Sequence, residues 1–125
     1  MATILIIDDE AVSRQILSAL VRSIDDSYEI KAFACPQEAF DWATKNSVDL
    51  VLTDFNMPVM NGTEFIRLFR SNPACTQIPV ILVSADNDPC MRKAAHEAGA
   101  TDFLGKPVDH HESRTLCRTL LENAT

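Results

Sequence analysis

Short apolar runs that each end in a polar residue recur along this chain, and they constrain its fold more than any other feature. The runs Ile4–Ile7, Leu50–Leu52 and Val80–Val83 consist only of isoleucine, leucine and valine. Runs of this length and composition are typical of buried strands in a parallel sheet, because helices cover both faces of such a sheet. Each run is followed by a segment with helical spacing, so the sequence predicts an α/β protein with right-handed crossovers.

Strand-like and helix-like segments alternate along the whole chain, without a linker or a low-complexity stretch. The expected strands cover residues 4–7, 28–33, 49–53, 79–84 and 101–104. The expected helices cover residues 11–24, 62–70, 88–98 and 109–121, together with a helix that begins at Pro36. Proline suits the first turn of a helix, and Gly99 suits the residue that ends one. Five β-α units without an internal repeat predict one domain over residues 1–125.

Charge and composition argue against several functional classes. The 125 residues carry a formal charge of −7, which disfavours binding to nucleic acid or to a membrane surface, since both attract basic patches. No apolar run approaches the roughly 18 residues of a transmembrane helix. The first expected strand begins almost at the first residue, which leaves no room for a signal peptide. The four cysteines are scattered, without a C-x-x-C pair, and in a chain without an export signal such thiols are expected to be reduced. We therefore expect a cytoplasmic protein.

Polar side chains follow the expected strands at the points where these strands end. Asp8 and Asp9 follow the first strand, and Asp54 follows the third. Ser84 ends the fourth strand, and Lys106 comes shortly after the fifth. Because the carboxyl ends of parallel strands meet at the edge where open α/β sheets bind ligands, we expect these side chains to converge. Two carboxylates about 4 Å apart repel by roughly 1 kcal/mol in water, so such a cluster needs a cation or a shifted pKa.

This set of side chains suits a divalent cation and phosphoryl chemistry. Mg²⁺ prefers oxygen ligands and typically takes one or two carboxylates together with phosphate oxygens. The three glycines of the chain cannot build a G-x-G-x-x-G motif or a P-loop, so the phosphoryl group is expected to be small or attached to another protein. Asp54 is the best nucleophile, because a carboxylate can accept a phosphoryl group as an aspartyl phosphate. Lys106 and the metal would stabilise the charge, and Ser84 would donate to a phosphoryl oxygen.

Four stretches of the chain resemble the receiver domain of two-component response regulators. They are ILIIDDE at 4–10, DLVLTDFNMPVMNG at 49–62, PVILVSA at 79–85 and GATDFLGKP at 99–107. Their combination and order are specific to that family, and the resemblance covers essentially the whole chain. It implies a flavodoxin-like fold, which is a doubly wound parallel sheet of five strands in the order 2-1-3-4-5, flanked by five helices.

The resemblance also implies which residues carry the phosphoryl group and the metal. Asp54 would be the phosphoacceptor. Asp8, Asp9 and Asp54 would hold Mg²⁺ together with the main-chain carbonyl of Asn56. Asn56 and Asp86 flank the site and would tune the hydrolysis of the phosphate.

Three further positions match residues that respond to phosphorylation in the family. Ser84 and Lys106 would contact the phosphoryl oxygens, and the Lys106–Pro107 peptide would be cis, which only an X-Pro bond adopts cheaply. Ser84 and Phe103 would be the switch residues, with Ser84 moving toward the phosphate and Phe103 turning inward to fill the vacated space.

The implied function is a phosphorylation switch. A histidine kinase or a histidine phosphotransfer protein would donate a phosphoryl group to Asp54 in a reaction that needs Mg²⁺. The added charge would change the surface formed by the fourth helix, the fifth strand and the fifth helix, and so control a partner or an attached output domain. Such a protein is not an enzyme, since it promotes only its own phosphorylation and dephosphorylation. A phosphorylation-dependent dimer is compatible with the resemblance.

Three other interpretations account for parts of the sequence. A small phosphatase of the haloacid-dehalogenase type needs a second acid two residues after its nucleophile, where this chain has Asn56. A pseudo-receiver that docks partners without phosphorylation usually lacks one of the acids or the lysine, and this chain has all of them. The tail at 106–122 is similar to receivers that precede HD-type cyclic-di-GMP phosphodiesterase domains, although an ordinary amphipathic last helix accounts for it slightly better.

Overall fold

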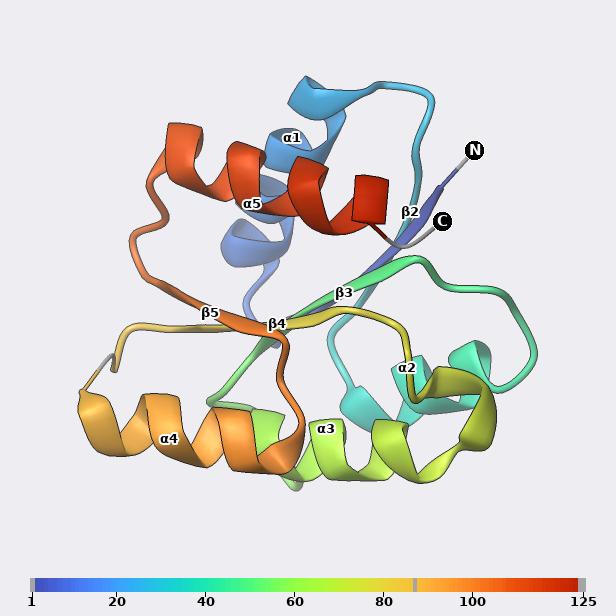
Figure 1. Cartoon of the computed structure of the whole chain (residues 1–125), viewed down its shortest axis with the longest axis vertical. Helices are drawn as coiled ribbons and strands as arrows, with labels where there is room; N and C mark the ends of the chain where they lie inside the picture. Colours follow the sequence, from blue (N-terminus) through green and yellow to red (C-terminus); the bar gives the residue numbers. More distant parts are fainter. Residues whose placement is uncertain (1, 87, 124–125) are drawn as a thin grey trace.

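The described residues, 2–86 and 88–123 in a computed structural model, form a five-stranded parallel sheet between two layers of helices (Figure 1). The strands are β1 (Thr3–Ile7), β2 (Glu29–Phe33), β3 (Leu50–Asp54), β4 (Val80–Ser84) and β5 (Asp102–Gly105). The helices are α1 (Ala11–Ile24), α2 (Pro36–Ala43), α3 (Gly62–Ser71), α4 (Pro89–Ala98) and α5 (His110–Asn123), with a short 3-10 helix η1 (Pro73–Cys75). The strand order is β2-β1-β3-β4-β5, which confirms the predicted topology.

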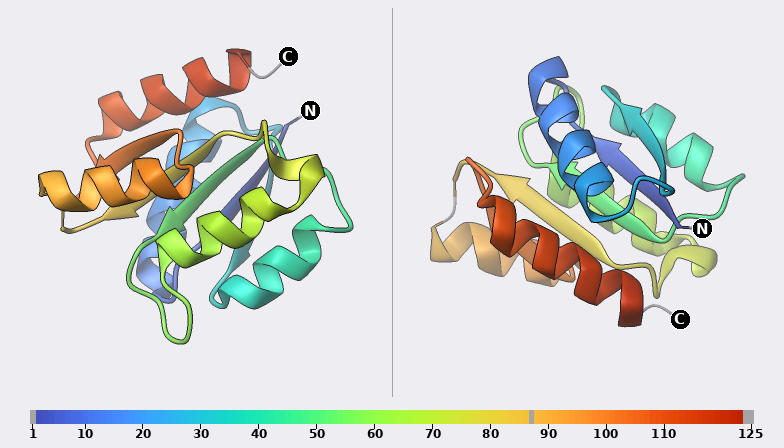
Figure 2. Two further views of the ribbon diagram at one scale, coloured as in Figure 1. Left: turned by 60° about the horizontal axis from the view of Figure 1, so that its bottom comes forward. Right: turned by 90° about the horizontal axis from the view of Figure 1, so that it is seen from above.

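The two faces of the sheet bury two separate apolar clusters. Helices α1 and α5 cover one face, and α2, α3 and α4 cover the other (Figures 1 and 2). Every residue of the central strands β3 and β4 is buried, which explains why their sequences are continuously apolar until the last residues. The edge strand β2 has no fully buried residue. Each leucine, isoleucine or valine buried in these clusters stabilises the fold by about 1.5–3 kcal/mol.

The boundaries of the elements follow local chemistry that is visible in the sequence. Helix α4 begins after Asp88, whose side chain accepts a hydrogen bond from the Met91 N–H at 2.8 Å. It ends at Gly99, which has a left-handed conformation with φ of 111°. Asp54 is the last residue of β3 rather than the first residue after it. The 3-10 turn at Pro73–Cys75 was not predicted, because one turn is too short to show a periodic pattern.

Parallel pairing brings the carboxyl ends of the strands to one edge of the sheet. Asp54 lies beside Val83, and Ser84 lies beside Gly105 in the register of the central strands. The last turn of α5 lies on the side of the molecule where β1 starts, away from this edge (Figure 2). Among the described residues, no helix combines the length and the apolar character needed to cross a membrane.

The cysteines provide a test of the fold. Cys35 and Cys90 are exposed, whereas Cys75 and Cys117 are buried, and burial raises the pKa of the Cys117 thiol to about 11. Since the thiolate is the reactive form, we expect Ellman's reagent to modify Cys35 and Cys90 rapidly in the native protein. Cys75 and Cys117 should react only after unfolding in denaturant. A Cys35→Ser/Cys90→Ser variant that still reacts rapidly without denaturant would contradict the placement of the two buried thiols.

Candidate functional site

The ammonium group of Lys106 lies between two buried carboxylates at the carboxyl edge of the sheet. Its Nζ donates to Asp8 Oδ2 at 3.0 Å and to Asp54 Oδ1 at 3.1 Å. Asp8 is fully buried, and Asp54 is 4% exposed. A third contact joins Lys106 Nζ to Ser13 Oγ at 3.4 Å. A buried carboxylate is costly unless it is paired, so this one ammonium group allows two acids to lie side by side inside the protein.

Asp8 is fixed by the turn that joins β1 to α1. Its Oδ1 accepts a hydrogen bond from the Glu10 N–H at 2.9 Å. Its main-chain carbonyl accepts from Nη1 of Arg14 at 2.8 Å. The carboxylate also lies near the start of α1, where the helix dipole favours a negative charge. The position of Asp8 therefore depends on the first turns of α1 as well as on the strand that precedes it.

Burial and the neighbouring acid together make Asp54 harder to ionise. Burial is the main cause that raises the pKa of Asp54, the charge of Asp8 adds to it, and the hydrogen bond from Lys106 acts in the opposite direction. For Lys106, burial alone would lower the pKa, but the hydrogen bonds to Asp8 and Asp54 outweigh it and raise the pKa. Lys106 is therefore protonated at neutral pH. Its single positive charge can balance only one of the two carboxylates.

Strands β4 and β5 place a hydroxyl group next to this cluster. Ser84 is fully buried, and its Oγ accepts from the Asp86 N–H at 3.1 Å. The Ser84 carbonyl accepts from the Lys106 N–H at 2.9 Å, which holds the ends of the two strands together. The Lys106–Pro107 peptide is cis. The exposed Asp86 lies in the loop after β4, at the rim of the site.

The loop after Asp54 returns to the site through Gly62. The Gly62 N–H donates to the Phe55 carbonyl at 2.8 Å. A Cβ atom added at Gly62 would lie 2.5 Å from the Asp54 carbonyl oxygen and 2.6 Å from Leu82 Cδ1. No other residue type fits so close to the backbone without displacing the end of β3. Asn56 is exposed in the same loop.

The tip of this loop contains a strained residue. Val59 has a φ of 74° and is fully exposed, although a β-branched residue disfavours this region of backbone space. The loop is closed on the other side by a capping box, in which Asn61 and Glu64 each accept from the backbone of the other. The residues that follow Val59 are fixed by this cap and by the bond from the Gly62 N–H to the Phe55 carbonyl.

The acidic residues form a set of oxygen ligands that suits a hard divalent cation. Carboxylate oxygens of Asp8, Asp9 and Glu10 lie within 4.8 Å of one another, and Asp9 and Glu10 are exposed. Among the described residues, this group includes Glu10, which was not predicted as a ligand, but not Asp54. Asp54 instead shares the Lys106 ammonium with Asp8. Donors of this kind fit Mg²⁺ and do not fit zinc.

The aromatic ring of Phe103 already lies in an inward position. Phe103 is 8% exposed, and the guanidinium carbon of Arg92 lies 4.6 Å from the centroid of its ring. A cation above an aromatic face stabilises this arrangement by about 0.5–1 kcal/mol at an exposed site. The predicted inward turn would therefore move a ring that, before phosphorylation, is already packed against Arg92 of α4.

Two residues of α1 contact the site and were not predicted. Ser13 contacts the Lys106 ammonium, and Arg14 binds the Asp8 carbonyl. Both lie on a helix whose sequence shows an ordinary amphipathic pattern. Ser13 and Arg14 follow Asp8 by five and six residues, which places them in the first turn of the helix after the acid. Only this spacing could have indicated that their side chains contact the site.

This arrangement of sheet, acids, lysine and hydroxyl defines the class of protein. The family model for the response regulator receiver domain matches residues 4–119. The chain therefore belongs to the response regulator receiver domain family, and it is a receiver domain of two-component signalling.

Several known proteins are similar to the chain. The cyclic di-GMP phosphodiesterase response regulator RpfG of Xanthomonas campestris is 39% identical over 119 residues, which cover 95% of this chain and 32% of RpfG. The chain thus spans about a third of that relative. The solved structure of the Vibrio cholerae chemotaxis protein CheY4 is 29% identical, with a TM-score of 0.88 over 96% of this chain and 98% of that one. The receiver domain of the sensor histidine kinase PA1611 of Pseudomonas aeruginosa, which has a magnesium ion coordinated in its active site cleft, is 25% identical, with a TM-score of 0.87 over 97% of this chain and 98% of that one.

The raised pKa of Asp54 predicts how stability depends on pH. A pKa above the ordinary 3.8 means that the folded state binds the proton more tightly than the unfolded state. Its stabilising contribution is present below pH 3.8 and is lost as the pH rises through the raised value. At neutral pH, in metal-free buffer, Asp54→Asn should raise the free energy of unfolding by about 1–4 kcal/mol, the range for the repulsion of two neighbouring like charges between water and a protein surface.

Urea unfolding monitored by circular dichroism measures this difference. Asp9→Asn is the matched control, because it removes an exposed acid from the same edge and should change stability less. The gain from Asp54→Asn should shrink as the pH is lowered toward the ordinary pKa. A variant that is less stable than wild type at neutral pH would show that Lys106 overcompensates the burial of Asp54.

The contact at Gly62 predicts a second effect on stability. Gly62→Ala should lower the free energy of unfolding by about 1–3 kcal/mol, because the new methyl group overlaps backbone and a buried leucine. Arg67→Ala, at an exposed position of the same helix, should stay within about 0.5 kcal/mol of wild type. Denaturant unfolding of both variants tests the prediction, and equal stabilities would show that the loop relaxes without cost.

Proposed function

We propose that Asp54 accepts a phosphoryl group from a histidine kinase or a histidine phosphotransfer protein in a Mg²⁺-dependent reaction. The observation that carries the proposal is the placement of Asp54 at the buried end of β3, beside Asp8 and within hydrogen-bond distance of Lys106. Burial makes the ionised form of Asp54 costly. A bound cation would stabilise that form, and so would a reaction that spreads its negative charge over more oxygen atoms. The family of the chain, in which phosphoryl acceptance is general, supports the same reaction.

The chain's own residues supply most of the chemistry. A carboxylate oxygen of Asp54 attacks phosphorus, so that a P–O bond forms while the P–N bond to the donor histidine breaks. Lys106 then exchanges its bond to Asp54 for a phosphoryl oxygen, and the Ser84 hydroxyl donates to another. Mg²⁺, held by Asp8, Asp9, Asp54 and the Asn56 carbonyl, would add positive charge at the phosphoryl oxygens.

Two features beside the site suit the approach of a phosphodonor protein. Val12 and Ile16 are 65% and 52% exposed on α1, although both are large apolar side chains. A cavity of about 160 Å³ next to them is lined mainly by apolar side chains and reaches Lys106 and Pro107. Ile16 lines this cavity, so the exposed side chains and the cavity together form an apolar surface that suits contact with a partner. We place the donor here, and we place the reaction in the cytoplasm, where histidine kinases act on receivers.

The surface formed by α4, β5 and α5 would carry the signal onward. Ser84 and Phe103 are the switch residues of this proposal, and Asn56 and Asp86 tune the lifetime of the phosphate from the rim. The receiver is not itself an enzyme beyond its own phosphorylation and dephosphorylation. The similarity to RpfG favours one particular output, in which this receiver controls an attached HD-type cyclic-di-GMP phosphodiesterase domain.

Intact-mass measurement after incubation with acetyl phosphate or phosphoramidate tests the reaction. Wild-type protein should gain the mass of one phosphoryl group when Mg²⁺ is present and none after chelation. Asp54→Asn should gain none under either condition. Asp26→Asn, which removes an exposed acid outside the site, should behave as wild type.

The proposal would be contradicted if no donor gave an adduct with protein that circular dichroism shows to be folded. A phosphorylation-independent docking module would then be the better account. An adduct that persists in Asp54→Asn would instead assign the phosphoryl group to another residue.

A further inference from the structure

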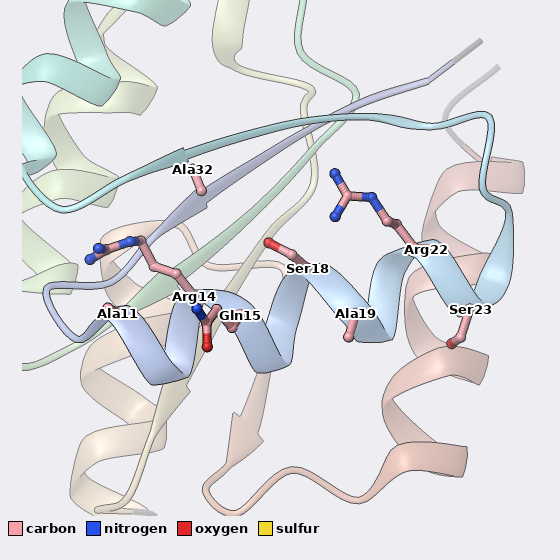
Figure 3. Close-up of a pocket in the computed structure, with 8 residues that line it drawn as sticks. All are labelled: Ala11, Arg14, Gln15, Ser18, Ala19, Arg22, Ser23 and Ala32. Carbon is pink, nitrogen blue, oxygen red and sulfur yellow. The ribbon is translucent and has the colours of Figure 1, made fainter.

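A groove runs along the flank of α1 that faces the edge strand β2, and the proposed phosphoryl transfer does not use it. The groove measures about 700 Å³. Figure 3 shows that Arg14, Ser18 and Arg22 point toward β2, whereas Gln15 and Ser23 point away from it. Ala32 of β2 forms the opposite wall. The hollow exists because a small alanine stands on the edge strand where a larger side chain would pack against α1.

The groove is basic, although the protein as a whole is acidic. Helix α1 carries Arg14 and Arg22 and no acidic residue, in a chain with a formal charge of −7. Within the part of the chain that the structure describes, neither arginine pairs with a carboxylate. Arg14 uses one N–H for the Asp8 carbonyl, and a guanidinium group has further donors on its other edge. Two cationic groups are thus available to an anionic ligand.

The spacing of the two arginines indicates the shape of that ligand. They lie eight residues apart on one helix, which is about 12 Å along the axis at roughly 1.5 Å per residue. An extended peptide covers about 3.3 Å per residue, so side chains four positions apart on it are separated by about 13 Å and point to the same side. Asp8–Glu10 and Asp25–Asp26 flank the helix and repel a longer polyanion. Ser18 lies between the arginines and can bond a backbone group of the peptide.

From this geometry we infer that the groove between α1 and β2 is a docking site for a short, extended, acidic segment of a partner protein. Two carboxylates of the segment, four residues apart, bind Arg14 and Arg22, and Ala32 leaves room for the backbone between them. The charge of the groove selects the class of partner, because a carboxylate accepts two parallel N–H bonds from a guanidinium group. Nucleic acid is disfavoured, since two arginines in an acidic protein do not form the extended basic footprint that it requires.

Fluorescence anisotropy with a labelled, end-capped peptide tests the inference in the full chain. The peptide carries glutamates at every fourth position, separated by serine and glycine, and a glutamine version is the uncharged control. Saturable binding to wild type is expected, with none to the glutamine peptide. Arg22→Gln should weaken binding about threefold to fivefold, the range of one exposed ion pair. Ala32→Leu should weaken it at unchanged net charge, because the leucine fills the groove.

The matched control separates the groove from general electrostatics. Arg67→Gln/Arg118→Gln removes two exposed charges elsewhere on the surface, the same change in net charge as Arg14→Gln/Arg22→Gln. Arg14→Gln/Arg22→Gln should weaken binding by about the product of two single losses, roughly ninefold to twenty-five-fold, whereas Arg67→Gln/Arg118→Gln should leave it close to wild type. Equal losses in both pairs, no binding by wild type, or full binding by Ala32→Leu would each overturn the inference. It would also fail if a single-stranded oligonucleotide bound with the same dependence on Arg22 while the peptide did not. Circular dichroism confirms that each variant is folded.

Discussion

The shared ammonium group of Lys106 is the interaction on which the rest of the structure depends. Asp8 directly follows β1 and Asp54 ends the neighbouring strand β3, so their burial side by side follows directly from the fold. Such a pair would oppose folding if it had no counter-charge. The ends of β4 and β5 are joined by the bond from the Lys106 N–H to the Ser84 carbonyl, which directs the lysine toward the acids. The sheet therefore brings the two carboxylates together and also positions the ammonium group that partly balances their charge.

The site and the α1 groove are joined by one side chain. Arg14 lines the groove and also binds the Asp8 carbonyl at 2.8 Å. A carboxylate that bound Arg14 in the groove would therefore act on a side chain that also contacts the main chain of Asp8. If the energies are coupled in this way, the coupling must be reciprocal, so occupancy of the acidic site would change affinity in the groove by the same factor. Ser13 makes a parallel connection from α1 to Lys106 at 3.4 Å.

The sequence predicted the parts of the molecule that depend on local pattern and on sheet topology. The continuous apolar runs identified the central strands, and the residues after them identified Asp8, Asp54 and Lys106 as neighbours. The strand order required the family resemblance, because apolar runs do not specify which strand lies beside which. Contacts made by long side chains, such as that of Arg14, could not be predicted, since they depend on rotamers and on the angle at which α1 crosses the sheet. The positive φ of Val59 could not be predicted either, because a β-branched residue rarely adopts this conformation.

The switch has to be understood from the free energy of two packed states rather than from the motion of one ring. Phe103 already lies beneath Arg92, so phosphorylation cannot act simply by drawing an exposed ring inward. A phosphoryl group on Asp54 would draw the Ser84 hydroxyl toward it as a donor, and the Oγ of the same hydroxyl accepts from the Asp86 N–H at 3.1 Å. A movement of Ser84 would therefore reach Asp86, which precedes α4, the helix that carries Arg92. Because a ligand shifts an equilibrium only by its different affinity for the two states, the contact between Arg92 and Phe103, which joins α4 to β5, belongs to the energy that a change of the α4–β5–α5 surface would have to overcome.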